Sequence, residues 1–265
     1  MTVGIDLELD GPVGRIWLER PEKRNAMTAA MWAALPGLVD TAASDPAVRV
    51  LVVRGRGEHF CAGADIAELG TALAADTGAV AYRSLNATAE AALATAPIAT
   101  VAAIDGSCIG GGVQLALACD LRVCTTRAAI GITAARLGIS FPAPSLERLV
   151  ATVGAAAARR LLMTAAVLDA AGAHHIGLVD AVVAPESLDD AVAATVAELL
   201  SVSSVTQLAA KEMVAEIAAT GTVSDELART WEQIAASHGD LDEGLRAFAT
   251  RGVPAFGPRP SRDHR

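Results

Sequence analysis

Two stretches of the sequence share one pattern: an almost continuous apolar run that ends in a glycine-rich loop. Residues 48–54 (VRVLVVR) lead into the loop 55–63, and residues 98–104 (IATVAAI) lead into the loop 106–112. Such runs are typical of strands that are covered on both faces, as in parallel sheets flanked by helices. A helix start follows the second loop, at about residues 112–118. The repeated pattern therefore predicts an α/β fold.

The flanking segments extend this prediction. Residues 4–19 predict a β-hairpin, because apolar and acidic side chains alternate before a turn at Gly11-Pro12. Thr28 is a candidate N-cap for a helix that ends near residue 43. Further strands are expected at residues 121–124, 129–132 and, less regularly, 178–183, and helices at residues 155–166, 169–175, 188–200, 205–219 and 225–235. We therefore expect an α/β core over residues 1–187 and a helical extension over residues 188–265, packed on the core or on a neighbouring subunit.

Composition excludes several classes of function. The net charge of −9 and the pI of about 5.0 disfavour a nucleic-acid backbone as partner. Arg159 and Arg160 interrupt the best candidate for a membrane span, residues 149–168, so no span is expected. No secretory signal is visible, and the cytoplasm is the expected location. The four cysteines, at positions 61, 108, 119 and 124, have neither zinc-site nor disulfide spacing, and we expect free, buried thiols.

Histidines offer little catalytic signal. His174 and His175 are neighbours, and neighbours on a helix point about 100° apart, so a solvated helix surface is favoured over a metal site. His59 is interpreted as a loop residue rather than a catalyst. The sequence predicts no metal ion.

The glycine-rich loops carry the chemistry that the sequence does predict. Residues 60–66 (FCAGADI) and 109–115 (IGGGVQL) follow the two buried strands. Glycines at a helix start let a ligand approach the backbone, and the free N–H groups there favour an oxyanion. A tight turn that only packs a helix against a strand would explain either loop taken alone.

Together and in this order, the loops resemble those of the enoyl-CoA hydratase/isomerase (crotonase) superfamily. The resemblance also covers residues 20–27 (RPEKRNAM), 164–183 with its Gly-Leu-Val-Asp segment, and the Ala-Phe-Gly tail at 255–257. It implies a crotonase-like ββα spiral core with a helical C-terminal region that builds a homotrimer or a dimer of trimers. It also implies an acyl-CoA thioester ligand, so that coenzyme A arrives with the ligand and no permanently bound cofactor is expected.

The resemblance assigns roles to individual positions. The backbone N–H groups of Ala64 and Gly111 would form an oxyanion hole for the thioester carbonyl. Other positions match those that hold coenzyme A: Ala62, Asp65 and Ile66 at the adenine and the pantetheine bend, and Lys23 and Arg24 near the phosphates. A solvated loop is an equally good reading of Lys23 and Arg24.

The sequence departs from the family at the two glutamates that hydratases use to hold and activate water. Gln114 stands at the first position and Ala134 at the second. Glutamine can orient a water but cannot take its proton, and alanine can do neither. Pro142 occupies a third position where other members place an acid. Other residues are weak candidates for the missing acid or base. Glu147 is expected to pair with Arg148, and Glu68 lies beyond the first loop. Arg136 could instead pair with a substrate carboxylate.

Two hypotheses therefore stay open. One is a lyase, isomerase or hydrolase that acts on an acyl-CoA through the oxyanion hole, with an unconventional base or one supplied by the substrate. The other is a non-catalytic acyl-CoA-binding protein or carrier in fatty-acid metabolism. A purely structural protein would have eroded loops, whereas both glycine loops are intact.

Overall fold

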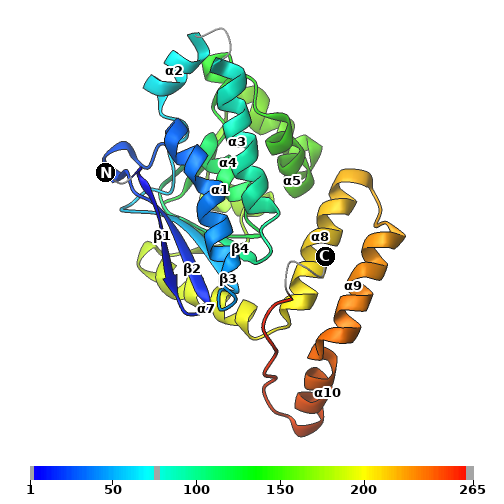
Figure 1. The fold of residues 1–265 in the computed structure, drawn as a ribbon. Coiled ribbons are helices and arrows are strands. Elements are labelled where there is room, and N and C mark those ends of the chain that lie inside the picture. Colours follow the sequence, from blue (N-terminus) through cyan, green and yellow to red (C-terminus); the bar gives the residue numbers. More distant parts are fainter. Residues whose placement is uncertain (1–2, 75–77, 261–265) are drawn as a thin grey trace.

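A computed structural model describes residues 3–74 and 78–260 (Figure 1). Within them, the main sheet has the strand order β1-β2-β3-β4-β6-β9. Its strands are β1 (Ile5–Asp10), β2 (Val13–Leu18), β3 (Val50–Gly55), β4 (Ala99–Ile104), β6 (Leu121–Thr125) and β9 (Ala181–Val183). Only β1 and β2 pair antiparallel, as the hairpin predicted around Gly11-Pro12; the other neighbours are parallel. The α/β prediction is confirmed.

Alternating side chains place a separate core on each face of this sheet. Leu51 and Val53 point into the larger core, with helices α1 (Ala29–Ser44), α3 (Gly78–Ala94) and α4 (Gly111–Ala118). Val50 and Val52 point to the opposite face, which α7 (Leu188–Leu200) covers. The strands are therefore buried on both sides, which accounts for their continuous apolar sequence.

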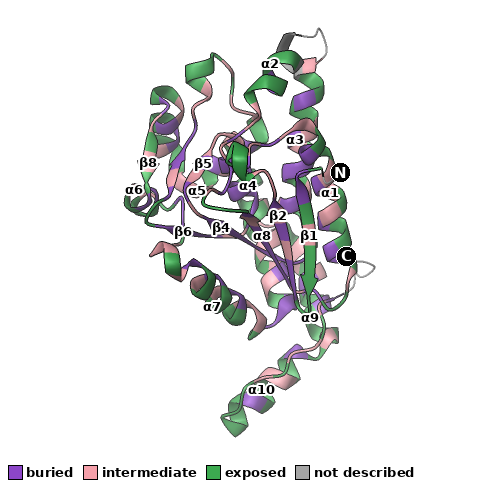
Figure 2. Cartoon of the chain, turned by 90° about the vertical axis from the view of Figure 1, so that its left-hand side faces the viewer, coloured by how far each residue is buried: buried purple, intermediate pink, exposed green. Residues whose placement is uncertain are grey.

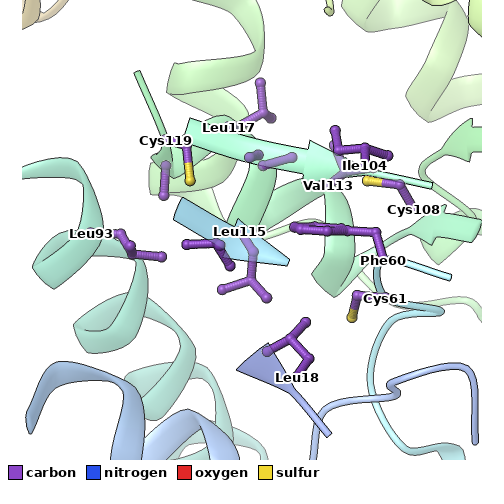
Figure 3. Packing of buried hydrophobic residues seen from close by; sticks show 14 of the residues in the cluster. Leu18, Phe60, Cys61, Leu93, Ile104, Cys108, Val113, Leu115, Leu117 and Cys119 are labelled. Carbon is purple, nitrogen blue, oxygen red and sulfur yellow. The ribbon is translucent and has the colours of Figure 1, made fainter. Parts of the chain in front are cut away.

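A smaller sheet lies beside the glycine-rich loops. It pairs β5 (Ser107–Ile109) with β7 (Ala129–Gly131), and β7 with β8 (Val167–Asp169). A further bridge joins Cys61 to Cys108, so this sheet connects the two loops directly. Figure 3 shows Phe60 and Cys61 near Val113, Leu115 and Cys108, in the apolar packing beneath the loops.

The C-terminal helices stand apart from the core. Helix α8 (Ser204–Thr220) is fastened to it by Lys211, whose Nζ donates to the Ile98 carbonyl and to the Asp120 carboxylate at 3.1 and 3.0 Å. Helices α9 (Asp225–His238) and α10 (Asp240–Thr250) extend away from the sheet (Figures 1 and 2). The chain then returns, and the Arg259 guanidinium donates to the Val48 carbonyl at 3.1 Å.

Several elements differ from the sequence-based expectations. The helix expected at 155–166 is the second half of α5 (Ala143–Thr164), which is interrupted where Gly154 adopts φ 73°. Helices α2 (Ile66–Ala74), α3 and α10 were not predicted, nor were β5 and β8. The strand expected at residues 129–132 is β7 (Ala129–Gly131) of the smaller sheet. Thr28 caps α1 as predicted, accepting from the Met31 N–H at 3.1 Å.

The remaining helices are short or lie at the edges. Helix α6 (Ala170–His175) follows β8, and 3₁₀ turns occur at η1 (Pro21–Lys23), η2 (Ala134–Leu137) and η3 (Pro185–Ser187). In the described part of the chain, no single helix has both the length and the apolar character of a membrane span. Two helices, Pro185–Leu200 and Ser204–Thr220, which are bent relative to each other, reach this length and apolar character only when they are counted together.

Candidate active site

The first glycine-rich loop is paired with the segment around Met27. The Met27 N–H donates to the Gly63 carbonyl at 2.7 Å, and the Asp65 N–H donates to the Met27 carbonyl at 2.8 Å. In such a parallel bridge the groups on either side of Ala64 face Met27, so the N–H of Ala64 itself points away from it. Among the described residues it has no hydrogen-bond acceptor.

The second loop presents a matching donor. The Gly110 N–H donates to the Gly131 carbonyl at 2.9 Å, which fixes the chain just before α4. Gly111 is the first residue of α4, where backbone N–H groups have no partner within the helix. A Cβ placed on Gly111 would lie 3.5 Å from the Ala64 nitrogen. The two predicted oxyanion-hole residues are therefore brought together.

Both donors open into one cavity of about 820 Å³, a volume that includes space open to solvent. Loops, α3, α4 and the segment after η2 form its walls. The lining residues are Ala62, Gly63, Ala64, Ile66, Leu69, Tyr82, Arg83, Asn86, Ile109, Gly110, Gly111, Gln114, Thr133, Ala134, Leu137, Ile139, Ser140, Phe141 and Pro142. The described lining contains no carboxylate and no histidine.

The two positions that match hydratase glutamates both line this cavity. Gln114 lies one turn after Gly111 on α4 and is 4 % exposed. Its Oε1 accepts from Asn86 Nδ2 at 3.4 Å, and Asn86 Oδ1 has no partner among the described residues. Ala134 begins η2 on the opposite wall. A neutral amide pair and a methyl group thus occupy the two positions at which the resemblance predicts carboxylates in a hydratase.

Tyr82 is the one lining residue with a weakly acidic hydroxyl. Burial raises its pKa to about 12, although the Trp32 side chain opposes this rise. The hydroxyl therefore stays protonated near neutral pH. It can donate a hydrogen bond but cannot serve as a general base.

The substitute acids considered from the sequence lie outside the cavity. Glu68 Oε2 accepts from the Ala29 N–H at 2.8 Å, at the start of α1. Glu147 is exposed, and its expected pairing with Arg148 is wrong, because Arg148 Nη1 binds Glu90 at 2.9 Å. Arg136 does not line the cavity either, since its Nη2 donates to the Ala165 carbonyl at 2.8 Å.

Glu90 is a fully buried carboxylate one turn after Asn86 on α3. Burial raises its pKa, while the hydroxyl of Ser145 and the guanidinium of Arg148 oppose this rise. The Ser145 hydroxyl donates to its carboxylate oxygens at 2.7 and 2.9 Å. Glu90 does not line the cavity, so its contacts join α3 to α5 behind the wall.

Only some of the positions predicted to hold coenzyme A line the cavity. Ala62 and Ile66 line the cavity. Asp65 lies just outside it, where Arg20 Nη2 binds its Oδ2 at 2.9 Å and lowers its pKa. Lys23 and Arg24 are exposed and do not line the cavity, although the Arg24 carbonyl accepts from the Ala62 N–H at 2.9 Å.

His59, His174 and the four cysteines make structural contacts. His59 Nδ1 accepts from the Ser107 N–H at 3.1 Å, and the ring of His174 contacts the Val179 carbonyl at 3.1 Å. All four cysteines are buried and free, as expected, and burial raises the pKa of Cys61 to about 12. No cluster of potential metal-ligating side chains occurs within residues 3–74 and 78–260.

Sequence reasoning missed the polar wall formed by α3. Tyr82, Arg83 and Asn86 all line the cavity, yet this helix was not predicted. The available signal was the four-residue spacing of Tyr82, Asn86 and Glu90, which places three polar side chains on one helical face.

Known proteins share this architecture over nearly the whole chain. A sequence model described as Enoyl-CoA hydratase/isomerase matches residues 8–259. The chain belongs to the enoyl-CoA hydratase/isomerase family. A protein assigned as an enoyl-CoA hydratase in Thermus thermophilus is 35% identical over 254 residues, which cover 93% of this chain and 98% of the relative.

Solved structures of family members have the same fold as this chain. One from Hyphomonas neptunium superposes with a TM-score of 0.92 at 35% identity, covering 98% of this chain and 99% of that one. A protein from Thermobifida fusca, assigned as an enoyl-CoA hydratase and solved in complex with acetoacetyl-CoA, gives 0.76 at 33% identity, covering 89% and 95%. The crotonase-like fold predicted from the loops is confirmed.

The close packing of the start of α4 against the first loop leads to a testable prediction. A Cβ on Gly112 would lie 2.4 Å from the Cys61 carbonyl oxygen, whereas one on Gly37 of α1 would meet nothing within 4 Å. Gly112→Ala should lower the free energy of unfolding by about 1–3 kcal/mol, the usual cost of overpacking. Gly37→Ala should leave it unchanged or raise it. Urea unfolding measures both, and equal stability of the two variants would contradict this reading.

Proposed function

We propose that this protein binds an acyl-CoA thioester whose carbonyl oxygen accepts hydrogen bonds from the Ala64 and Gly111 N–H groups. The observation that carries the proposal is a pair of backbone N–H groups that have no acceptor among the described residues and belong to residues lining one cavity. The crystallised Thermobifida fusca relative supports the class of ligand, because it holds acetoacetyl-CoA. Such donors would stabilise the negative charge that gathers on the carbonyl oxygen when an enolate forms.

Coenzyme A would lie along the first loop. Ala62 and Ile66, which line the cavity, would contact it there, and Asp65 would act indirectly, through its ion pair with Arg20. Lys23 and Arg24, on the exposed neighbouring loop, would approach the phosphates from outside the cavity. This arrangement needs no permanently bound cofactor.

The same cavity argues against efficient hydration. Hydration needs a base to take a proton from water and an acid to protonate the α-carbon. Gln114 and Ala134 supply neither, and Tyr82 stays protonated. Any turnover would therefore use an atypical group or one carried by the substrate. The absence of a base from the described lining equally favours the second candidate, a non-catalytic acyl-CoA-binding protein or carrier.

Ligand binding is tested by thermal stability. Saturating acyl-CoA should raise the melting temperature, because a ligand of the native state adds RT ln(1 + [L]/Kd) to its stability. The measurement is a thermal-shift series with saturated acyl-CoAs from four to sixteen carbons, with free coenzyme A as the control. A melting temperature that no thioester changes would refute the proposal.

Hydration is tested with crotonyl-CoA. The rate should be at least about 10⁴-fold below that of a glutamate-bearing relative, given that acid–base groups contribute roughly 10²–10⁴ each. The double variant Gln114→Glu/Ala134→Glu should raise the rate measurably, and each single variant should raise it less, because the two carboxylates act as a unit. Rapid hydration by the unmodified protein would contradict the assignment of these positions.

We also propose that the C-terminal helices build a homotrimer or a dimer of trimers. Several large apolar side chains are exposed on α8, α10 and the segment after them: Val214, Ile217, Leu241, Leu245, Phe248 and Val253. Burying such side chains against another copy would remove this surface from water. Light scattering should give a trimer or hexamer, and Phe248→Glu should shift it toward smaller species. A monodisperse monomer at micromolar concentration would refute this proposal.

A further inference from the structure

We propose that Arg83 selects acyl-CoA thioesters whose acyl group ends in a carboxylate. This inference rests on the proposed function, because it assigns the acyl class that the same cavity would accept. Arg83 is the only residue of the described lining with a formal charge at neutral pH. The other polar members are hydroxyls and amides, so the cavity carries one positive charge and no compensating carboxylate.

The guanidinium of Arg83 has no hydrogen-bond or ion-pair partner among the described residues. Other arginines near the site are engaged: Arg20 with Asp65, Arg148 with Glu90, and Arg136 with the Ala165 carbonyl. Arg136 was the sequence-based candidate for binding a substrate carboxylate, and its position outside the cavity removes it from that role. Arg83 is the described arginine that lines the cavity.

A chain of neighbouring residues leads from the oxyanion hole to Arg83. Gln114 lies one turn after Gly111 on α4, and its amide contacts Asn86 on α3 at 3.4 Å. Arg83 lies one turn before Asn86, and residues three apart on a helix are surface neighbours. This route leaves the hole on the α3 side, whereas the residues proposed to hold coenzyme A lie on the first loop. Arg83 is an exposed residue that lines the cavity on this α3 side, where the proposal places the end of the acyl group.

The chemistry of the wall fits a carboxylate better than a methyl terminus. A guanidinium forms two parallel, charge-assisted hydrogen bonds with a carboxylate. The protein as a whole carries a net charge of −9 and would repel an additional anion, so a local cation is needed to favour it. The amide N–H groups of the neighbouring Asn86 and Gln114 can donate further hydrogen bonds to the same carboxylate.

The experiment measures dissociation constants by calorimetry for matched pairs of thioesters. Each pair has the same chain length but differs in the terminal group: succinyl-CoA against butyryl-CoA, glutaryl-CoA against pentanoyl-CoA, and adipyl-CoA against hexanoyl-CoA. The unmodified protein should prefer the carboxylate-bearing member of at least one pair by about tenfold, the scale of a hydrogen bond to a charged group. Arg83→Gln should abolish this preference and leave the affinity for the neutral member unchanged.

Two further variants complete the test. Arg83→Lys should keep part of the preference, because it retains the charge without the paired donors. Arg159→Gln, an exposed position on α5 outside the cavity, makes the same charge change and should keep the full preference. Equal affinity for the two members of every pair would overturn the proposal, and so would a preference that survives Arg83→Gln. It would also be overturned if Arg83→Gln lowered the affinity for both members of a pair equally. That last result would place the guanidinium against coenzyme A. Failure of acyl-CoA binding itself would appear differently, as no measurable affinity for either member.

Discussion

The bridge between Met27 and Ala64 is the constraint on which the site depends. The Met27 N–H donates to the Gly63 carbonyl, and the Met27 carbonyl accepts from the Asp65 N–H. The N–H of Ala64, between these two residues, is therefore directed away from Met27. Asn25 holds the same segment in place: its side chain accepts from the Arg20 N–H at 2.9 Å and donates to the His59 carbonyl at 2.6 Å. The donor is therefore oriented before any ligand arrives, which is what electrostatic stabilisation requires.

The opposite half of the site depends on close backbone packing. Gly112 lets the start of α4 approach the Cys61 carbonyl, and Gly63 approaches the Ile109 carbonyl so closely that an added Cβ would lie 2.9 Å from it. These contacts hold the Gly111 N–H beside the Ala64 N–H. The polar wall of the cavity is built differently, from side chains of α3 and α4: the amides of Asn86 and Gln114, the Tyr82 hydroxyl and the Arg83 guanidinium. The site combines a pair of backbone N–H groups, which we propose stabilise an anion, with walls whose described residues offer no base near neutral pH.

The sequence predicted the parts of this arrangement that are encoded locally. The apolar runs at β3 and β4, the hairpin and the glycine loops were recognisable because each follows a short-range pattern. The residues that complete the cavity depend on tertiary packing instead. Arg83 and Asn86 reach the cavity only because α3 lies against α4, and Arg148 binds Glu90, 58 positions away, rather than its neighbour Glu147. No local pattern distinguishes those partners.

We propose that the Ala64 and Gly111 N–H groups polarise the carbonyl of a bound thioester. Isotope-edited infrared spectroscopy of butyryl-CoA labelled with ¹³C at the thioester carbon measures this polarisation directly, because hydrogen bonds to the carbonyl oxygen weaken the C=O bond. We expect the carbonyl stretch of the bound ligand to lie at lower frequency than that of the same thioester in water. A stretch at the same or a higher frequency in the bound state would contradict it.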